Sequence, residues 1–331
     1  MRKQNRFHWM SMMMIGFFLV MVCLTSQAWA AGEKYASRPI QIVVGYQPGT
    51  VDTSLRPFTD KLPEYLGQPI SFLYKPGASG TIGASFVAKS KADGYTLLAG
   101  TPGAVVMAPL YRQGIGYFFE DLFPICSLVD SPQILVLKAD SRWKSIQDVI
   151  SEAKKAPGKI TYSTSGVLGN SHIPVELFLK MAGLKMTHVP TDGAARSVQS
   201  LLGGHVDMVS VTMGSSLPLI KSGNLRLIAS FDKQRLKEFP NAPTMSELGY
   251  PVVITSWYSL LAPKGTPPEV VKAIEKGCEK VMQEHKGFVA DRVKQLGLRM
   301  AYLNTEQFTN ELRMQRDALR EIVRDLAKTV K

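Results

Sequence analysis

The alternation of short apolar runs with helical patterns between residues 39 and 328 constrains the fold more than any other feature. Runs rich in branched and aromatic residues predict strands at 39–46, 70–74, 95–101, 133–139, 159–165, 185–191, 206–212, 225–231 and 256–263. Several of these runs are continuously apolar, which is typical of strands covered on both faces. Amphipathic patterns predict helices at 145–158, 173–183, 194–204, 267–285 and 305–328. This order indicates an α/β protein with mostly parallel sheets.

The sequence contains no internal repeat, no low-complexity segment and no long linker. Any boundary between domains must therefore fall within strands or short loops. Two α/β domains joined in this way leave a cleft between them. Ligands bind in such clefts at the carboxyl ends of strands and the N-termini of helices.

The first thirty residues have the organisation of a secretory signal peptide. A basic start precedes an apolar run at 10–24, and Ala28 and Ala30 have the spacing of a cleavage site. We expect cleavage after Ala30. A membrane anchor is the alternative interpretation, but the run is shorter than the roughly 20 apolar residues that a spanning helix needs. We therefore expect an exported protein.

Charge and cysteine content narrow the function classes. The formal net charge is +12, and removing residues 1–30, which hold three Lys/Arg and no Asp/Glu, leaves +9. The basic residues are scattered, without the Lys/Arg block of a nucleic-acid-binding arm, so we expect no nucleic-acid partner. Beyond residue 30 the cysteines are Cys126 and Cys278, with no C-x-x-C. Two buried thiols are favoured over a disulfide.

The segment YSTSGVLGNSH at 162–172 joins a predicted strand to a predicted helix. It places Ser171 beside His172, but no G-x-S-x-G elbow is complete and no carboxylate can be assigned to orient a base. P-loop and dinucleotide fingerprints are absent, and the histidines beyond residue 30 share no metal-ligand spacing. We therefore predict no catalytic residue, metal or cofactor. Either the loop offers N–H groups and hydroxyls to an anion, or Ser171 only caps its helix.

Three other predicted strand-to-helix turns have the same composition, at 43–58, 75–90 and 99–111. Each is rich in glycine, serine and threonine. Four such turns are more than helix capping requires. Together they describe a polar, glycine-lined cleft without an evident acid, base or metal, which is typical of a binding protein.

The order and spacing of several segments resemble the Bug family, the extracytoplasmic receptors of tripartite tricarboxylate transporters. The resemblance extends from residue 37 to the final predicted helix. It rests on LGQPI at 66–70, the stretch 75–101 that begins KPGASGTIGASF, APGKITYSTSG at 156–166, SLLGGHVDM at 200–208, SGNLRLIA at 222–229, FPNAPTMSELGY at 239–250 and TSWYSLLAPKGTPPEVV at 255–271.

The resemblance implies a type II periplasmic binding protein fold, in which two α/β domains are joined by two crossing strands and a ligand cleft lies between them. Domain 1 would comprise 35–127 and 258–331, and domain 2 would comprise 128–257. The crossings are expected near Ser127–Asp130 and Thr255–Ser259.

The implied function is that of a monomeric periplasmic receptor. It would capture a small organic carboxylate by hinge closure and deliver it to transporter subunits in the membrane. One alternative is a ligand sensor for a signalling membrane partner. A further hypothesis is an exported hydrolase that uses Ser171 and His172.

The turns and the resemblance together predict the ligand-binding residues. They are Tyr46, Gln47, Gly49, Thr50, Asp52, Ser79, Thr101, Thr164, Ser165, Gly166, Asn170, Ser171, His172, Asp192 and Thr212.

Departures from the family pattern bear on the ligand. The family's first loop usually reads P-F-x-x-G-G-x-x-D, whereas residues 44–52 read VGYQPGTVD, so Tyr46 would replace the aromatic wall. An Asp that often follows the GGHVD segment is Val211 here. Its loss argues against an amino-acid ligand, although Asp192 could pair with an ammonium group. A non-amino carboxylate is favoured.

Overall fold

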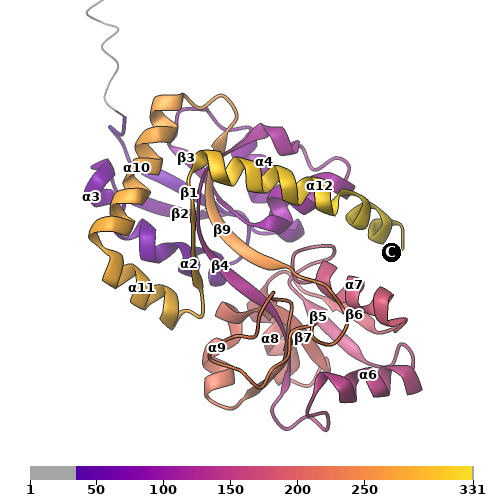
Figure 1. The fold of residues 1–331 in the computed structure, drawn as a ribbon. Coiled ribbons are helices and arrows are strands. Elements are labelled where there is room, and N and C mark those ends of the chain that lie inside the picture. Colours follow the sequence, from indigo (N-terminus) through magenta and orange to yellow (C-terminus); the bar gives the residue numbers. More distant parts are fainter. Residues whose placement is uncertain (1–34, 330–331) are drawn as a thin grey trace, which may run out of the picture. The chain divides into compact units, whose positions relative to one another are not determined.

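The computed structural model describes residues 35–329, and residues 38–329 belong to one compact unit (Figure 1). The predicted signal peptide lies outside the described residues. The predicted α/β class is confirmed, because strands and helices alternate along the chain.

The strands of the described residues form one sheet. They are β1 Ile40–Val44, β2 Ile70–Tyr74, β3 Thr96–Gly100, β4 Leu122–Lys138, β5 Thr161–Thr164, β6 Thr187–Pro190, β7 Met208–Thr212, β8 Leu225–Ser230, β9 Thr255–Pro263 and β10 Arg299–Leu303. Their order is β2-β1-β3-β9-β4-β7-β5-β6, and β8 and β10 also pair with β4.

The helices lie between and after these strands. They are α2 Thr50–Thr59, α3 Pro63–Leu66, α4 Thr81–Ala88, α5 Ala108–Tyr111, α6 Ile146–Lys155, α7 Ile173–Ala182, α8 Ala194–Leu202, α9 Met213–Lys221, α10 Pro268–Glu284, α11 Lys286–Gln295 and α12 Thr305–Thr329. Short helical turns are η1 Ala78–Gly80, η2 Gly103–Met107 and η3 Phe119–Asp121. The five predicted helices are all present, with boundaries shifted by a few residues.

The sheet is mixed, which corrects the prediction of mostly parallel sheets. β1 is parallel to β2 and β3, and β5 is parallel to β6 and β7. By contrast, β4 is antiparallel to each of its neighbours, and β3 is antiparallel to β9. Hydropathy reports which strands are buried and carries no information about strand direction, so the sequence pattern could not reveal this arrangement.

β4 and β9 run side by side through the middle of the fold (Figure 1). Their pairing extends from Leu122 opposite Pro263 to Pro132 opposite Thr255. β4 begins eleven residues before the predicted strand at 133. Pro124 and Pro132 hid its first half, because proline interrupts a strand pattern. The register shifts after Pro124 and after Ser127 accommodate these irregularities.

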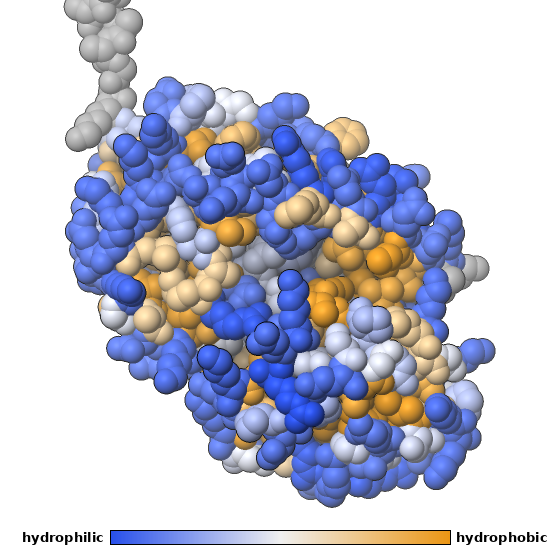
Figure 2. Space-filling view, in the orientation of Figure 1, coloured by the Kyte–Doolittle hydropathy of each residue, from blue (hydrophilic) through white to orange (hydrophobic). Residues whose placement is uncertain are grey.

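Buried hydrophobic clusters pack the helices against different parts of the sheet. One packs α6 and α7 against β4, β5 and β7, and includes Trp143, Tyr162 and Phe178. Another packs α4 and α12 against β3 and β9, and includes Trp257 and Phe308. Burying apolar surface at about 25 cal/mol per Å² makes such clusters the main source of stability. Hydrophilic residues cover most of the face drawn in Figure 2, with hydrophobic residues in separate patches between them.

The two cysteines of the described chain, Cys126 in β4 and Cys278 in α10, are buried and form no disulfide. This agrees with the preference for two buried thiols. The hydrogen bond with the neighbouring Cys278 thiol, and then burial, raise the pKa of Cys126 well above its usual value, so its thiol stays protonated.

Candidate ligand-binding site

A cavity of about 150 Å³ lies among segments that are far apart in the sequence. It is lined by Tyr46, Gln47, Pro48, Gly49, Thr50, Val51, Ser79, Thr101, Gln133, Ser165, Gly169, Asn170, Ser171, Gly193, Ala194, Ala195, Val211, Thr212, Ser215, Ser256 and Tyr258. None of these lining residues carries an ionisable acid or base of the Asp, Glu, Lys, Arg or His type. Hydroxyls, amides and backbone groups provide the polar surface.

Three helices begin at this cavity. The first helical hydrogen bond of α2 runs from Thr53 N–H to the Gly49 carbonyl, at 3.0 Å. In α8 the equivalent bond joins Ser197 to Gly193, at 3.2 Å. The amides before these bonds have no partner within their helix. α8 and α9 also lack a side-chain cap at their N-caps, Gly193 and Thr212. Helix N-termini carry partial positive charge, so this arrangement favours an anion.

Hydroxyl groups connect the start of α2 with the start of α9 across the cavity. Thr50 Oγ1 lies 3.0 Å from Ser215 Oγ. Ser215 Oγ in turn lies 2.7 Å from Thr212 Oγ1. Thr50 and Ser215 are separated by 165 positions in the sequence, so only the tertiary fold brings them together.

The loop between β5 and α7 forms another wall. Ser165 N–H donates to Ser171 Oγ at 3.1 Å, and the two serine hydroxyls lie 2.8 Å apart. Because the hydroxyls share one hydrogen bond, one O–H remains to donate toward the cavity. Asn170 donates its side-chain amide to the Thr255 carbonyl at 3.3 Å and to Ser256 Oγ.

A tight turn at Ala78 and Ser79 forms the opposite wall. Both residues adopt left-handed backbone, with φ of 50° and 58°, which is uncommon outside glycine. The Tyr46 hydroxyl donates to the Ser79 carbonyl at 2.8 Å and lies 3.2 Å from Thr101 Oγ1. Arg112 donates to the Ala78 carbonyl at 2.9 Å. Burial raises the pKa of Tyr46, so its hydroxyl stays protonated and can hold this turn.

Gly166 packs directly against this turn. A Cβ built on Gly166 would lie 2.2 Å from Ser79 Oγ, and the residue has φ of +148°. A Cβ built on Gly103 would lie 3.6 Å from the Asn170 amide nitrogen, an ordinary van der Waals contact. The cavity walls therefore meet closely on this side, and only glycine fits at position 166.

Ten of the fifteen predicted residues line the cavity: Tyr46, Gln47, Gly49, Thr50, Ser79, Thr101, Ser165, Asn170, Ser171 and Thr212. The structure thus brings together turns from four separate parts of the sequence. Five predicted residues are not among the lining residues: Asp52, Thr164, Gly166, His172 and Asp192.

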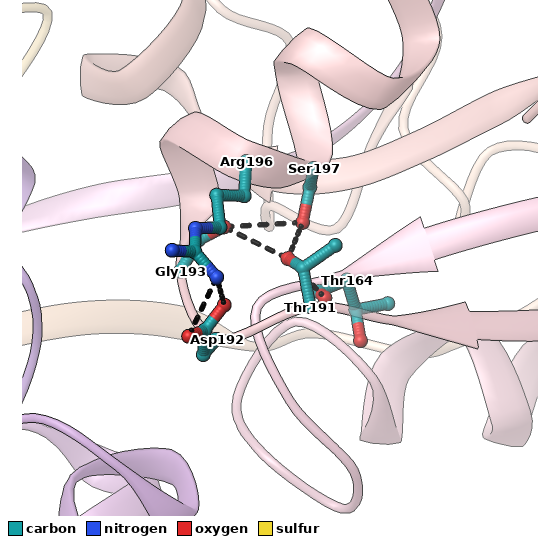
Figure 3. Close-up of polar contacts among 6 residues, drawn as sticks. All are labelled: Thr164, Thr191, Asp192, Gly193, Arg196 and Ser197. Carbon is teal, nitrogen blue, oxygen red and sulfur yellow. Dashed lines mark hydrogen bonds and ion pairs between the residues drawn. The ribbon is translucent and has the colours of Figure 1, made fainter. Parts of the chain in front are cut away.

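Asp52 and Asp192 are both occupied elsewhere. Asp52 is buried and accepts hydrogen bonds from Gly49 N–H at 2.7 Å and from the Tyr74 hydroxyl at 3.1 Å. It therefore secures the start of α2. Asp192 is exposed and pairs with Arg196 one helical turn on, at 2.8 Å (Figure 3). Neither carboxylate belongs to the cavity wall.

Thr164 and His172 are buried behind the loop rather than on its cavity side. Thr164 donates to the Gly166 carbonyl at 3.0 Å. The Thr191 N–H donates to the Thr164 carbonyl at 2.9 Å, and the Thr191 hydroxyl lies 2.9 Å from the Gly193 carbonyl and 2.7 Å from Ser197 Oγ (Figure 3). These contacts join the β5–α7 loop to the start of α8.

The sequence-based prediction missed several lining residues. Gln133 and Ser256 lie on β4 and β9 and are joined by a 3.1 Å hydrogen bond from the glutamine amide. Tyr258 follows on β9, where burial raises its pKa to about 12. Ser215 lies within the first turn of α9. The polar Gln133 and Ser256 at the edges of apolar runs were the available signal, because an uncompensated buried polar side chain is costly.

Residues 35–329 contain no helix with the length and apolar character needed to cross a membrane. In the same residues, no three His, Cys, Asp or Glu side chains are grouped so that they could hold a metal ion.

Comparison with known proteins identifies relatives of the whole fold. BugT of Bordetella pertussis is 34% identical over 273 residues, which cover 81% of this chain and 83% of BugT. The structure of the periplasmic binding protein BugD is 28% identical, covers 88% of this chain and 98% of that chain, and has a TM-score of 0.82. The structure of R. palustris Rpa4515 with adipate is 28% identical, covers 87% and 97%, and has a TM-score of 0.81.

These similarities confirm the type II periplasmic binding protein fold and the resemblance to the Bug family. The family is one of solute-binding receptors. The family model described as the tripartite tricarboxylate transporter family receptor matches residues 55–326. The chain therefore belongs to the tripartite tricarboxylate transporter receptor family.

Proposed function

We propose that this protein is a periplasmic receptor that captures a small organic carboxylate in the cavity and delivers it to transporter subunits in the membrane. One observation carries the proposal: the starts of α2, α8 and α9 and the β5–α7 loop line a single cavity without a charged side chain. The R. palustris relative solved with adipate supports a carboxylate.

The cavity suits a carboxylate held by dipoles. A buried anion needs several hydrogen bonds to replace its hydration. The first-turn amides, together with the hydroxyls of Thr50, Ser171 and Thr212, provide such donors. A ligand ammonium group would find no carboxylate among the lining residues, because Asp192 pairs with Arg196. We therefore favour a carboxylate without an amino group.

The same geometry argues against the hydrolase hypothesis. His172 is fully buried, and its Nδ1 accepts the Leu168 N–H at 2.9 Å. Its Nε2 lies 3.0 Å from the Tyr162 hydroxyl. Both ring nitrogens are therefore engaged away from Ser171, whose hydroxyl pairs with Ser165. We propose that the protein binds its ligand without chemical conversion.

We also propose that the walls close around the ligand by a hinge motion, with domain 1 at 35–127 and 258–331 and domain 2 at 128–257. β4 and β9 would supply the hinge, because they are the paired strands that cross between these parts. Contacts that would form on closure are Thr50 with Ser215 and the Tyr111 hydroxyl with the Val167 carbonyl, at 3.0 and 3.2 Å.

Thermal unfolding with a panel of organic acids tests the binding function. A ligand that binds only the folded state raises the melting temperature in a saturable way. We expect a shift with adipate or another small carboxylate and none with adipamide, its neutral counterpart. Mass spectrometry of the supernatant after denaturation would identify a co-purified acid. Absence of both a co-purified acid and any shift would contradict the proposal.

Capture of membrane proteins tests the partner. Ligand-loaded protein, immobilised and exposed to solubilised host membranes, should retain transporter subunits. Retention of a sensor kinase instead would favour the alternative of a signalling receptor. Ligand-free protein is the control.

A further inference from the structure

A cluster of ionisable side chains, two of them buried and two partly buried, lies directly behind the β5–α7 loop. It comprises Tyr162, His172, Glu176 and His188, none of which lines the cavity. His172 is fully buried, and its ring stacks on that of His188 with centroids 3.8 Å apart and an angle of 14°. Tyr162 stacks on His188 at 4.9 Å. Three rings thus form one stack beneath the loop.

His172 accepts a hydrogen bond from the loop. The Leu168 N–H donates to His172 Nδ1 at 2.9 Å, so Nδ1 carries no proton. The ring proton is therefore on Nε2, which lies 3.0 Å from the Tyr162 oxygen and 3.4 Å from Glu176 Oε1. Tyr162 donates its own hydroxyl to Glu176. These assignments give a series of hydrogen bonds that runs from the Leu168 N–H through His172 to Glu176.

His188 contacts Thr164 as a hydrogen-bond donor, whereas His172 contacts the loop as an acceptor. The Thr164 hydroxyl has one hydrogen, which it donates to the Gly166 carbonyl at 3.0 Å. His188 Nε2 lies 2.7 Å from the same hydroxyl oxygen, and with the Thr164 hydrogen directed at Gly166 we assign Nε2 as the donor. Burial, with the neighbouring His172 second, lowers the pKa of His188 to about 3, which keeps this ring neutral near pH 7.

The hydrogen bonds from His172 and from His188 through Thr164 contact the loop at residues whose backbone conformation is unfavourable. Gly166 has φ of +148°, and Leu168 has φ of +51°, a left-handed conformation that is costly for a branched residue. His172 accepts the Leu168 N–H, and Thr164, which contacts His188, donates to the Gly166 carbonyl. Ser165 and Ser171, which line the cavity, lie at either end of this short stretch.

We propose that His172 and His188 are positioning residues for ligand binding, His172 as a hydrogen-bond acceptor at Nδ1 and His188 as a hydrogen-bond donor at Nε2. Together they hold the strained stretch 166–168 so that Ser165 and Ser171 present their hydroxyls to the ligand. This inference rests on the proposed function, in which that wall contacts a carboxylate.

The two roles predict opposite tolerance to amide substitutions. Asparagine places its oxygen near the position of histidine Nδ1, whereas glutamine places its nitrogen near Nε2. His172→Asn should therefore retain the acceptor for Leu168, and His172→Gln should lose it. At the other ring, His188→Gln should retain the donor to Thr164, and His188→Asn should lose it.

Calorimetric titration with adipate tests this pattern. We expect His172→Gln and His188→Asn to weaken binding about tenfold, the effect of one lost buried hydrogen bond. His172→Asn and His188→Gln should stay within about threefold of the wild type, a smaller loss because the hydrogen bond is kept. His205→Asn, on an exposed histidine outside the cluster, is the control. Equal losses within each pair would overturn the proposal.

Ligand-free measurements separate this inference from the proposed function. In ¹⁵N spectra of the wild type, both imidazoles should be neutral with the proton on Nε2. Amide exchange at Leu168 should be slow in the wild type and in His172→Asn, and at least about tenfold faster in His172→Gln, because one hydrogen bond is lost. A proton on His172 Nδ1, or unchanged exchange in His172→Gln, would overturn the positioning role. Lack of adipate binding by the wild type would count against the proposed function instead.

Discussion

Two walls of the cavity, at the start of α2 and in the β5–α7 loop, are built differently. The wall at the start of α2 has exposed residues at Gln47, Pro48 and Gly49, and one buried carboxylate, Asp52, secures it. The β5–α7 wall is backed by a stack of three rings, of which Tyr162 and His172 are buried. Both offer amides and hydroxyls, but they differ in the number of groups that fix the backbone. The comparison suggests one wall that is preformed and one that depends on closure for its final geometry.

The largest expected effect compares Gly166→Ala with Gly49→Ala. Both glycines have φ of +148°, so alanine is strained at either position. Only at Gly166 would the new Cβ also meet Ser79 Oγ, at 2.2 Å. We expect Gly166→Ala to cost about 2–4 kcal/mol of stability, with loss of adipate binding, and Gly49→Ala to cost about 1–2 kcal/mol. Chemical unfolding and calorimetry measure both.

The control for this pair is the double variant Gly166→Ala with Ser79→Gly. It removes the clash and keeps the backbone strain, so its stability should approach that of Gly49→Ala. Equal effects of the two single alanine variants would show that the walls do not differ in packing.

The next effect is the loss of stability at acid pH, which we expect from His188 behind the β5–α7 wall. The pKa of His188 falls to about 3 in the folded protein, from about 6.5 when unfolded. Below pH 6.5 the unfolded state therefore binds more protons, and stability decreases as the pH falls toward 3. The facing groups are Tyr162, His172 and Glu176.

Chemical unfolding at pH 6.5 and pH 4.5 measures this contribution. A single titrating group can change the free energy of unfolding by at most about 1.4 kcal/mol per pH unit. Because His188 is partly exposed, we expect a total change of about 1–2 kcal/mol between the two pH values. His188→Gln should lose this part of the pH dependence. If the variant and the wild type lose the same free energy of unfolding between pH 6.5 and pH 4.5, the His188 ring is not held neutral in the folded protein.

Removing the serine hydroxyls should weaken ligand binding next. Ser165→Ala and Ser171→Ala each remove a group that lines the cavity, and we expect about a tenfold loss of adipate affinity for each. Ser222→Ala, an exposed residue at the end of α9, serves as the control. Unchanged affinity in both cavity variants would exclude this loop from the binding site.

The smallest effect concerns the contact between α2 and α9. Thr50→Val and Ser215→Ala each break the 3.0 Å hydroxyl pair, which is partly buried. A double-variant cycle should give a coupling of about 0.5–1 kcal/mol in the binding free energy. A coupling of zero would mean that this pair does not contribute to the closed, ligand-bound form.

Local patterns in the sequence were enough to predict most helices and strands and about half of the residues that line the cavity. Apolar runs marked nine strands, and glycine- and hydroxyl-rich turns marked ten of the lining residues. These features follow from interactions between near neighbours in the chain, such as helix initiation after a strand. The first half of β4 and all of β10 lacked such a pattern, because prolines or exposed residues interrupt them.

The sequence by itself determined the α/β class, the positions of the polar turns and the absence of a charged constellation among them. Only the tertiary structure decided that β4 and β9 run antiparallel, that Gln133, Ser256 and Tyr258 join the cavity, and that Asp192 and His172 face away from it. The reason is physical: the β4–β9 pairing and the contact of Gln133 with Ser256 join residues at least 123 positions apart, and no local pattern records such partners.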